Sequence, residues 1–387
     1  MAEPMPEDIR VLYVIGGRRI GGMETHLLTL ASQLPRGLRS VVCCLDASAD
    51  YRARLAAVGI SHVDLACPVW TGRHGLRAWW RFTRLVKRID PHVVHAYGFS
   101  ADVLATLLRL TGTRARIITS RRGEERNRRH QAVRRVVNRL TTRIVCVSSE
   151  TAAFVRATEA PAPQLVEVIP NGVVPAPAMP RPAAGSGTRP IRFGTLGTVK
   201  PIKGTDLLVD AFLRFPTGAR VELVVAGLID RPWAEALRDR ARPEPRIHFV
   251  GRTSAPRDFL ADLDVFVLPS RSEGMSNALL EAMAVGLPCI ATDVGSNRSV
   301  LSPVGEPAAG LVVDPSADAI YRAMDTMAGN AASRARYGAR GASLVATRHT
   351  IAGMVSQYEH LYRSVLGQPL PAVDHPQHVR HGMSVDA

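Results

Sequence analysis

A proline-rich stretch separates two series of short apolar runs along the chain. The first series begins at residues 10–16 (RVLYVIG), a continuous apolar run typical of a buried parallel strand, and a helical pattern follows from about Met23 to Leu34. Four later runs in this half are expected to form strands: Ser40–Leu45, His92–His95, Ile117–Ser120 and Ile144–Ser148. Strands that alternate with helices predict a doubly wound α/β domain.

The stretch 175–190 (PAPAMPRPAAGSGTRP) interrupts the alternation and has the composition of a linker. After it the alternation resumes, with six strands expected at Ile191–Leu196, Arg220–Ala226, Arg246–Val250, Val265–Leu268, Pro288–Thr292 and Gly310–Val313. Apolar residues at spacings of three and four predict a helix over 350–366, and the polar residues 367–387 have the composition of a disordered tail. We therefore expect two α/β domains, over residues 1–174 and 191–349.

Length and composition exclude several classes of protein. The 387 residues fit two or three domains, and a mean hydropathy near zero, with no apolar stretch of about 20 residues, argues against a multispanning membrane protein. The first ten residues (MAEPMPEDIR) lack the basic start and apolar segment of a secretory signal. The five cysteines form no CxxC pair, which predicts reduced thiols in a cytoplasmic protein.

Positive charge is concentrated in the N-terminal half. Residues 1–180 contain 26 Lys and Arg against 14 Asp and Glu, whereas the remaining 207 residues contain 23 against 20. A basic surface of this kind suits an acidic partner, such as nucleic acid, an anionic membrane or a phosphate-bearing acceptor.

The most informative segment for chemistry is 270–286, SRSEGMSNALLEAMAVG. Glu273 follows an expected strand in a polar turn, a helix can start near Gly274 with Ser276 or Asn277 as its cap, and Glu281 lies one turn further in. Free backbone N–H groups at such a helix start can hold a phosphate or sugar oxygen. A carboxylate one turn deeper can accept hydrogen bonds from two ribose hydroxyls; the alternative is that both glutamates are ordinary surface acids.

Four other segments accompany it in order: IGGRRIGGMETHLLTLASQL, CVSSETAAFV, VIPNGV and GTLGTVKPIKGTDLLVDAF. Together they make the chain resemble the retaining glycosyltransferases of family 4, which have the GT-B fold of two facing Rossmann-like domains with a last helix that crosses back to the first. The resemblance implies that Glu281 binds the nucleotide ribose and that Glu273 holds the transferred sugar. It also implies that the backbone of Gly274, Met275, Ser276 and Asn277 contacts sugar and phosphate.

Lys203 ends a glycine-punctuated loop after the expected strand at 191–196. A lysine there can neutralise a diphosphate leaving group, while the alternative is a solvated loop lysine. Members of the family that the chain resembles usually carry an arginine five residues earlier, where this sequence has Thr198. Lys200 is a candidate for the second charge.

Two strand ends in the N-terminal half add weaker candidates. In the glycine loop after the first strand, the resemblance implies a role for Gly22 beside the donor phosphates; Glu24 either joins it or serves as a first-turn acid of its helix. Family members often have His-x-His where this chain has His95 and Tyr97, so that either residue lines the site or His95 is a core histidine.

Three charged features have competing interpretations. Arg121 and Arg122 end another strand, where they contact phosphate or only add surface charge. Asp262 and Asp264 spell DxD, the metal motif of a different glycosyltransferase fold, but their place before a strand argues against a metal. Residues 73–88 (RHGLRAWWRFTRLVKR) form a basic, Trp-bearing helix that either binds an anionic membrane or packs on its own sheet, and residues 121–143 add further arginines. Nucleic acid is not expected, because no motif for it accompanies the charge.

We therefore expect a retaining glycosyltransferase of hexosyltransferase type, in the synthesis of bacterial polysaccharide or glycolipid. It would move a sugar from a nucleoside diphosphate sugar to a hydroxyl acceptor, lipid-linked or saccharide, without a metal or other cofactor. It would be cytoplasmic or peripheral at the inner face of the membrane. The alternatives are a catalytically impaired sugar-nucleotide-binding protein and a nucleotide-sugar epimerase on the same scaffold.

Overall fold

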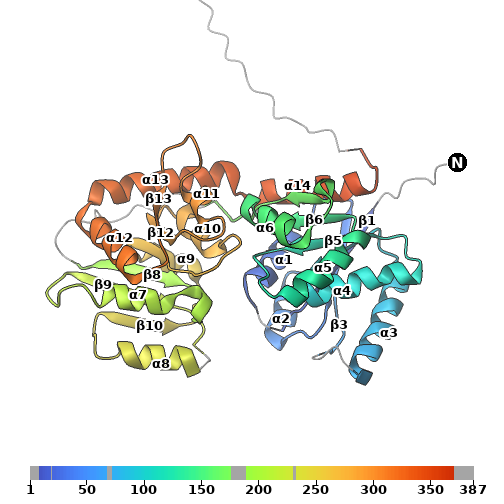
Figure 1. The fold of residues 1–387 in the computed structure, drawn as a ribbon, viewed down its shortest axis with the longest axis horizontal. Helices are drawn as coiled ribbons and strands as arrows, with labels where there is room; N and C mark the ends of the chain where they lie inside the picture. The colour runs from blue at the N-terminus through green and yellow to red at the C-terminus, as the bar shows by residue number, and fades with distance from the viewer. Residues whose placement is uncertain (1–7, 19, 68–71, 176–188, 230–231, 370–387) are drawn as a thin grey trace, which may run out of the picture.

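Two parallel sheets, each covered by helices on both faces, make up the molecule (Figure 1). The computed structural model describes residues 8–18, 20–67, 72–175, 189–229 and 232–369. The first half contains β1 (Ile9–Ile15), α1 (Gly22–Ser32), β2 (Leu38–Cys44), α2 (Ala49–Ala57), β3 (His62–Asp64), α3 (Gly72–Ile89), β4 (Val93–Tyr97), α4 (Phe99–Leu107), η1 (Leu108–Thr111), β5 (Arg116–Arg121), α5 (Arg128–Leu140), β6 (Arg143–Cys146), α6 (Ser149–Glu159), η2 (Pro163–Leu165) and β7 (Val166–Val168).

The second half begins at β8, after the proline-rich stretch. It contains β8 (Ile191–Leu196), η3 (Pro201–Lys203), α7 (Thr205–Phe212), β9 (Val221–Ala226), α8 (Pro232–Ala241), β10 (Ile247–Gly251), α9 (Pro256–Ala261), β11 (Val265–Leu268), α10 (Asn277–Ala284), β12 (Cys289–Thr292), α11 (Asn297–Leu301), β13 (Gly310–Val313), α12 (Ala317–Gly329), α13 (Ala331–Arg348) and α14 (Ile351–Val365).

The strand orders are those of doubly wound sheets. The first sheet runs β3-β2-β1-β4-β5-β6-β7 and the second β10-β9-β8-β11-β12-β13, all with parallel neighbours. The chain reverses direction of winding between β1 and β4 and between β8 and β11. Ligands of such sheets bind at the carboxyl ends of the strands at this switch point, so the loops after β1, β4, β8 and β11 are where a site is expected.

The last helix leaves the second half and completes the core of the first. Met354, Tyr358 and Tyr362 of α14 are buried in the same apolar cluster as Ile9 and Leu27, and Figure 1 shows α14 lying over the first half while α13 lies over the second. The α/β fold predicted from the sequence, with its crossing helix, is confirmed.

The chain crosses between the halves twice, and the two crossings touch. Val173 forms a β-bridge with Thr350; its N–H donates to the His349 carbonyl at 2.8 Å, and its carbonyl accepts from Ile351 at 3.3 Å. Gly172 permits this approach, because a Cβ atom there would lie 2.3 Å from the Thr350 carbonyl oxygen. The two crossings therefore form one narrow connection.

Most expected strands lie within two residues of their predicted bounds, and β8, β11 and β13 match them. The sequence interpretation missed β3 and β7, which have three residues each and are only half-buried, so they carry no apolar run. All five cysteines lie in the described part of the chain, where each is buried and none forms a disulfide. The predicted linker at 175–190 and the predicted disordered tail at 367–387 lie mostly outside the described residues. No helix in the described ranges is both long and apolar enough to cross a bilayer.

Candidate active site

The loop after β11 and the start of α10 form the best-defined part of the site. Ser276 caps α10 by accepting a hydrogen bond from the Leu279 N–H at 3.3 Å, so of the two caps that the sequence allowed, Ser276 is the one used. Gly274 is held from the other side, since its carbonyl accepts from the Ser296 N–H at 3.1 Å. Gly295, at φ +53°, lies so close to the Glu273 carbonyl that a Cβ atom would sit 2.2 Å from it. The loop is thus fixed by backbone contacts at both of its edges.

Glu273 and Lys203 meet at the switch point of the second sheet. The Lys203 ammonium lies 2.5 Å from Glu273 Oε1, and the Ser270 hydroxyl donates to the same oxygen at 2.7 Å. The Glu273 side chain is 8% exposed and that of Lys203 31% exposed, so the lysine keeps access to solvent. Lys203 is placed there by Gly204, at φ +64°, whose backbone packs against the Pro269 carbonyl.

The two companions considered for Lys203 lie on the same loop. Thr198 is half-buried after β8, and Lys200 is exposed at the start of η3. A threonine carries no charge, so this strand end has one fewer cation than the family pattern calls for.

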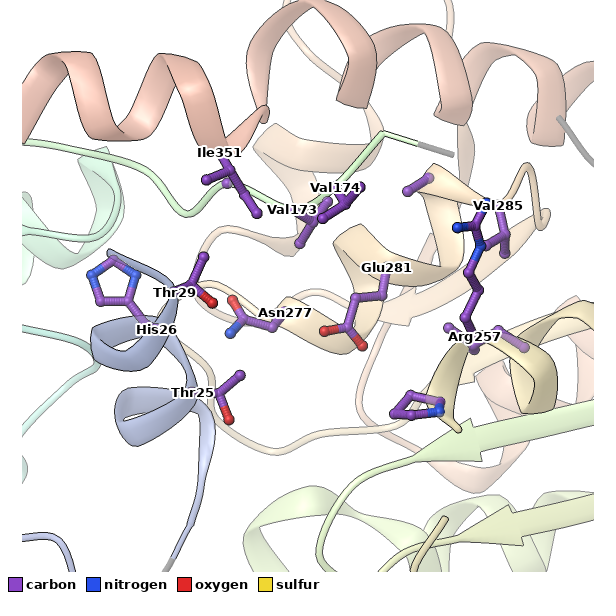
Figure 2. A pocket seen from close by; sticks show the side chains of 14 residues that line it. Thr25, His26, Thr29, Val173, Val174, Arg257, Asn277, Glu281, Val285 and Ile351 are labelled. Atoms are coloured by element: carbon purple, nitrogen blue, oxygen red, sulfur yellow. The ribbon is translucent and has the colours of Figure 1, made fainter. Parts of the chain in front are cut away.

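Glu281 faces a cavity of about 340 Å³ between the two halves (Figure 2). Its carboxylate makes no hydrogen bond or ion pair with any described residue, and burial raises its pKa to about 7. The cavity wall comes from α1, from the crossing segment, from α9 and from α10. Its residues are Thr25, His26, Thr29, Gly172, Val173, Val174, Pro256, Arg257, Leu260, Asn277, Glu281, Ala284, Val285 and Ile351.

The glycine loop on the N-terminal side starts α1 at the cleft. Gly22 is the first residue of α1 and is exposed, and a Cβ atom there would meet nothing within 4 Å. Glu24 turns back on its own helix, where its Oε2 accepts from the Gly21 N–H at 3.0 Å, and burial raises its pKa. This contact is the first-turn role that the sequence left open for Glu24.

His95 does not line the cleft in this structure. Its ring is fully buried, with Nδ1 2.9 Å from the Tyr362 hydroxyl and Nε2 2.9 Å from the Ser120 hydroxyl. Burial lowers its pKa to about 3, so the ring is neutral. Tyr97 is 1% exposed, and its ring lies beside that of His95 with centroids 4.6 Å apart and planes tilted by 34°. Of the alternatives, the structure has the core histidine, because α14 covers this strand end.

Arg121 corrects a prediction, since its side chain is buried inside the first half and is open to neither a phosphate ligand nor solvent. Its guanidinium is buried, 2.9 Å from Asp102 and 3.0 Å from Glu159, and it also donates to Asn138 at 3.1 Å. Arg134 joins the same two carboxylates. Burial of a guanidinium requires such partners, and these residues join α4, α5 and α6 behind β5.

Arg122 is next along the chain and points to the opposite side. Its Nη2 donates to the Asn171 side-chain oxygen. The Asn171 amide donates in turn to Asn277 Oδ1 at 2.6 Å and to the Met275 carbonyl at 3.2 Å. Arg122 is therefore tied to the start of α10, in the other half of the molecule.

The acids of the DxD sequence are paired with arginines. Asp264 accepts from Arg189 through both oxygens at 2.8 Å and from the Arg192 N–H at 2.8 Å, and Asp262 pairs with the Arg192 side chain. Among the described residues, no group of three or more His, Cys, Asp and Glu is placed to hold a metal ion.

Several cavity residues escaped the sequence interpretation. Thr25 and Thr29 lie one turn apart on α1, which is a signal that could have placed them on one face, together with His26. Asn171 lies in the segment VIPNGV. Its hydrogen-bond partners, Met275 and Asn277, are more than 100 residues away along the chain, so the segment itself does not reveal them.

Comparison with known proteins identifies the chain. Residues 20–176 match the family described as Glycosyltransferase Family 4, and residues 190–330 match Glycosyl transferases group 1. The chain is a glycosyltransferase with the GT-B fold, and its two halves belong to these two families. Anabaena Alr3699/HepE, whose crystal structure is in complex with UDP and glucose, has the same fold, with a TM-score of 0.80 and 17% identity over 92% of this chain and 100% of that one.

Two curated glycosyltransferases match over part of their length. The lipopolysaccharide core biosynthesis mannosyltransferase LpsB of Rhizobium meliloti is 35% identical over 157 residues, 39% of this chain and 44% of LpsB. The phosphatidylinositol N-acetylglucosaminyltransferase GPI3 subunit of Saccharomyces cerevisiae is 29% identical over 185 residues, 43% of this chain and 40% of that subunit. Both matches span less than half of the relative's length.

Proposed function

We propose that this glycosyltransferase moves a sugar from a nucleoside diphosphate sugar to a hydroxyl acceptor with retention of anomeric configuration. The observation that carries the proposal is the Glu281 carboxylate, which faces the interdomain cavity without a partner among the residues that the structure describes. A half-buried carboxylate is costly unless something donates to it, and two vicinal ribose hydroxyls are suited to do so. The UDP and glucose bound by Alr3699/HepE are ligands of the same class.

The remaining residues then take roles along the donor. The backbone of Gly274 to Asn277 at the start of α10 would contact phosphate and sugar, and Glu273 would accept from sugar hydroxyls. Lys203 would neutralise the diphosphate as its bond to the sugar breaks. Gly22 would lie beside the phosphates on the opposite wall.

The reaction on one face of the sugar needs no protein nucleophile. The acceptor oxygen forms a bond to the anomeric carbon as the bond from that carbon to the diphosphate oxygen breaks. The hydroxyl proton passes to a phosphate oxygen, which gives the glycoside and the nucleoside diphosphate. Closure of the two halves would keep water out of this step.

Thermal stabilisation tests the donor class. UDP, GDP, ADP, TDP and NAD are each added in EDTA to wild type, to Glu281→Ala and to Glu235→Ala, an exposed control on α8. We expect one nucleoside diphosphate to raise the Tm of wild type and of the control, with a loss of binding of roughly 100-fold in Glu281→Ala. Stabilisation by NAD alone, or by none of the five, would sink the proposed donor class. NMR of the product's anomeric proton then tests retention.

The acceptor is proposed to be lipid-linked, at an anionic membrane, because of the outer surface of α3. Phe82 packs inward and is fully buried, but Leu76 is 72% and Trp80 56% exposed. The Arg84 guanidinium lies 4.3 Å from the centre of the Trp80 ring. A hollow of about 400 Å³ beside them is lined by Val63, Trp80, Arg81, Arg84, Leu85 and Arg88.

Exposed aromatic and aliphatic side chains among arginines are what binding to an anionic membrane requires. Sedimentation with vesicles of phosphatidylcholine, with or without phosphatidylglycerol, tests this. Wild type is expected to bind only the anionic vesicles and to be released by salt. Trp80→Ser and Arg84→Ala should each weaken binding about fivefold, whereas Arg322→Ala, an exposed arginine of the second half, should not. Equal binding by all four proteins would exclude α3 as the membrane surface.

A further inference from the structure

Arg122 lies where the first half of the molecule contacts the loop between β11 and α10 in the second half. A Cβ atom at Gly274 would lie 2.3 Å from the Arg122 carbonyl oxygen, and one at Gly123 would lie 3.8 Å from the Gly274 nitrogen. Glu273 directly precedes Gly274, so the backbone of Arg122 lies beside the proposed donor site.

The guanidinium of Arg122 is only half satisfied. Nη2 donates to Asn171, a neutral partner, while Nη1 is buried and has no hydrogen-bond partner in the described part of the chain. Within the described ranges no carboxylate pairs with Arg122, in contrast to Arg121 with its two carboxylates. A buried N–H of a charged group without an acceptor is costly, so the missing partner is expected to be an anion.

The surroundings place that anion at the cleft. Asn171, which holds Arg122, bonds to Asn277, and both Asn277 and His26 line the cavity in Figure 2. Burial first, and then the charge of Arg122, lower the pKa of His26, which puts that charge near the cavity wall. On the loop after β8, Thr198 brings no charge, and Lys200 is exposed at the start of η3.

We propose that Arg122 binds the diphosphate of the donor nucleotide through Nη1, and so supplies from the N-terminal half the positive charge that Thr198 does not. The inference rests on the proposed function, because it assumes a nucleoside diphosphate in this cleft. Asn171 is then a positioning residue that holds the guanidinium toward the start of α10. The donor charge would pull the two halves together, since Lys203 belongs to the second half and Arg122 to the first.

Binding measured without acceptor tests the proposal. Affinities for UDP, UMP and uridine, or for the GDP, ADP or TDP series if wild type prefers that base, are determined by calorimetry. The proteins are wild type, Arg122→Lys, Arg122→Met and the control Arg126→Met, an exposed arginine on the same loop. We expect Arg122→Met to lose roughly tenfold or more in affinity for the diphosphate, less for the monophosphate and nothing for the nucleoside. Arg122→Lys should lose less.

A second substitution tests whether Arg122 acts through its charge or only maintains the fold. Thr198→Arg added to Arg122→Met should restore a large part of the diphosphate affinity, because it returns a cation to the site from the opposite wall. Equal losses for UDP and uridine would mean that Arg122 only maintains the fold, and would overturn the proposal. So would an unchanged diphosphate affinity in Arg122→Met.

Two further outcomes are distinguishable. If wild type binds none of the four nucleoside diphosphates, the proposed donor class fails and this inference falls with it; if Arg122→Met binds the diphosphate as wild type does, only the inference falls. A loss seen solely in binding to vesicles containing phosphatidic acid would assign Arg122 to a phosphate of the acceptor, which contradicts the donor assignment.

Discussion

Arg121 and His95 in the first half of the molecule and Glu281 in the second differ in whether the protein supplies partners for their polar groups. In the N-terminal half, Arg121 is paired with Asp102 and Glu159, and both ring nitrogens of His95 have hydroxyl partners. In the C-terminal half, Glu281 has no partner among the described residues and faces the cavity. Groups that satisfy one another stabilise the fold, and a group left without a partner at the cleft is available to a ligand.

Breaking the buried ion cluster should give the largest effect on stability. Arg121→Met leaves one guanidinium, that of Arg134, beside the carboxylates of Asp102 and Glu159, so uncompensated negative charge is buried. We expect a loss of about 3–5 kcal/mol in the free energy of unfolding, measured in urea without nucleotide. Arg122→Met should stay within about 1 kcal/mol of wild type. Similar stabilities for the two variants would mean that the contrast between these neighbours has no energetic basis.

Replacement of Lys203 is expected to affect catalysis more than stability, the reverse of replacement of Arg121. Lys203→Met should lower kcat by roughly 100- to 1,000-fold through loss of charge stabilisation in the transition state. It should cost less stability than Arg121→Met, because Glu273 keeps its hydrogen bond from Ser270. Lys203→Arg preserves the charge and should retain part of the activity. A Lys203→Met protein with wild-type kcat would remove Lys203 from the proposed mechanism.

Removal of a single tyrosine hydroxyl in each half compares a group with hydrogen-bond partners and a group without one among the described residues. Tyr362→Phe removes the group that contacts His95 at 2.9 Å and Tyr13 at 3.1 Å, and should cost about 1–2 kcal/mol. Tyr321 of α12 serves as the control in the other half, because its hydroxyl makes no hydrogen bond with a described residue. Tyr321→Phe should change the stability by less than about 0.5 kcal/mol. Urea unfolding of both variants decides whether the buried network contributes as expected.

The smallest expected effect is a pH dependence at Glu281. Its pKa is raised to about 7 in the folded protein, so ionised Glu281 destabilises the fold. The stability of wild type relative to Glu281→Gln should therefore fall as pH rises from about 4.5 to above 7. Because Glu281 is partly exposed, the full effect of the pKa shift is reduced. We expect the free energy of unfolding of Glu281→Gln to exceed that of wild type by about 1 kcal/mol at pH 8 and to equal it at pH 4.5. A constant difference across this range would contradict the shifted pKa.

The sequence predicted the features that have a local cause. Strand β11 is a continuous apolar run. Ser276 caps α10 through the N–H of Leu279, three residues later, so both features follow from short segments. Arg121 and Arg122 show the limit of such prediction. Adjacent residues at a strand end point to opposite sides, and nothing in TSRRG says which side holds Asp102 and Glu159.

Long-range contacts account for what else was missed. His95 is covered by Tyr362, 267 residues later, and Asn171 bonds to Asn277, 106 residues later. Neither partnership leaves a periodic signal in either segment. The strand ends could thus be located from the sequence, but not the residues that cover them.

The return of α14 to the first half has a consequence for dividing the protein. Six buried residues of α14 complete a core whose other buried members lie within residues 9–169: Met354, Val355, Tyr358, Leu361, Tyr362 and Val365. A recombinant fragment that stops at the proline-rich stretch would expose that core, whereas one that carries residues 350–366 on a short tether would close it. Exchange of donor halves between related enzymes therefore calls for two joints, one near Val173 and one near Thr350, where the two crossing segments already lie side by side.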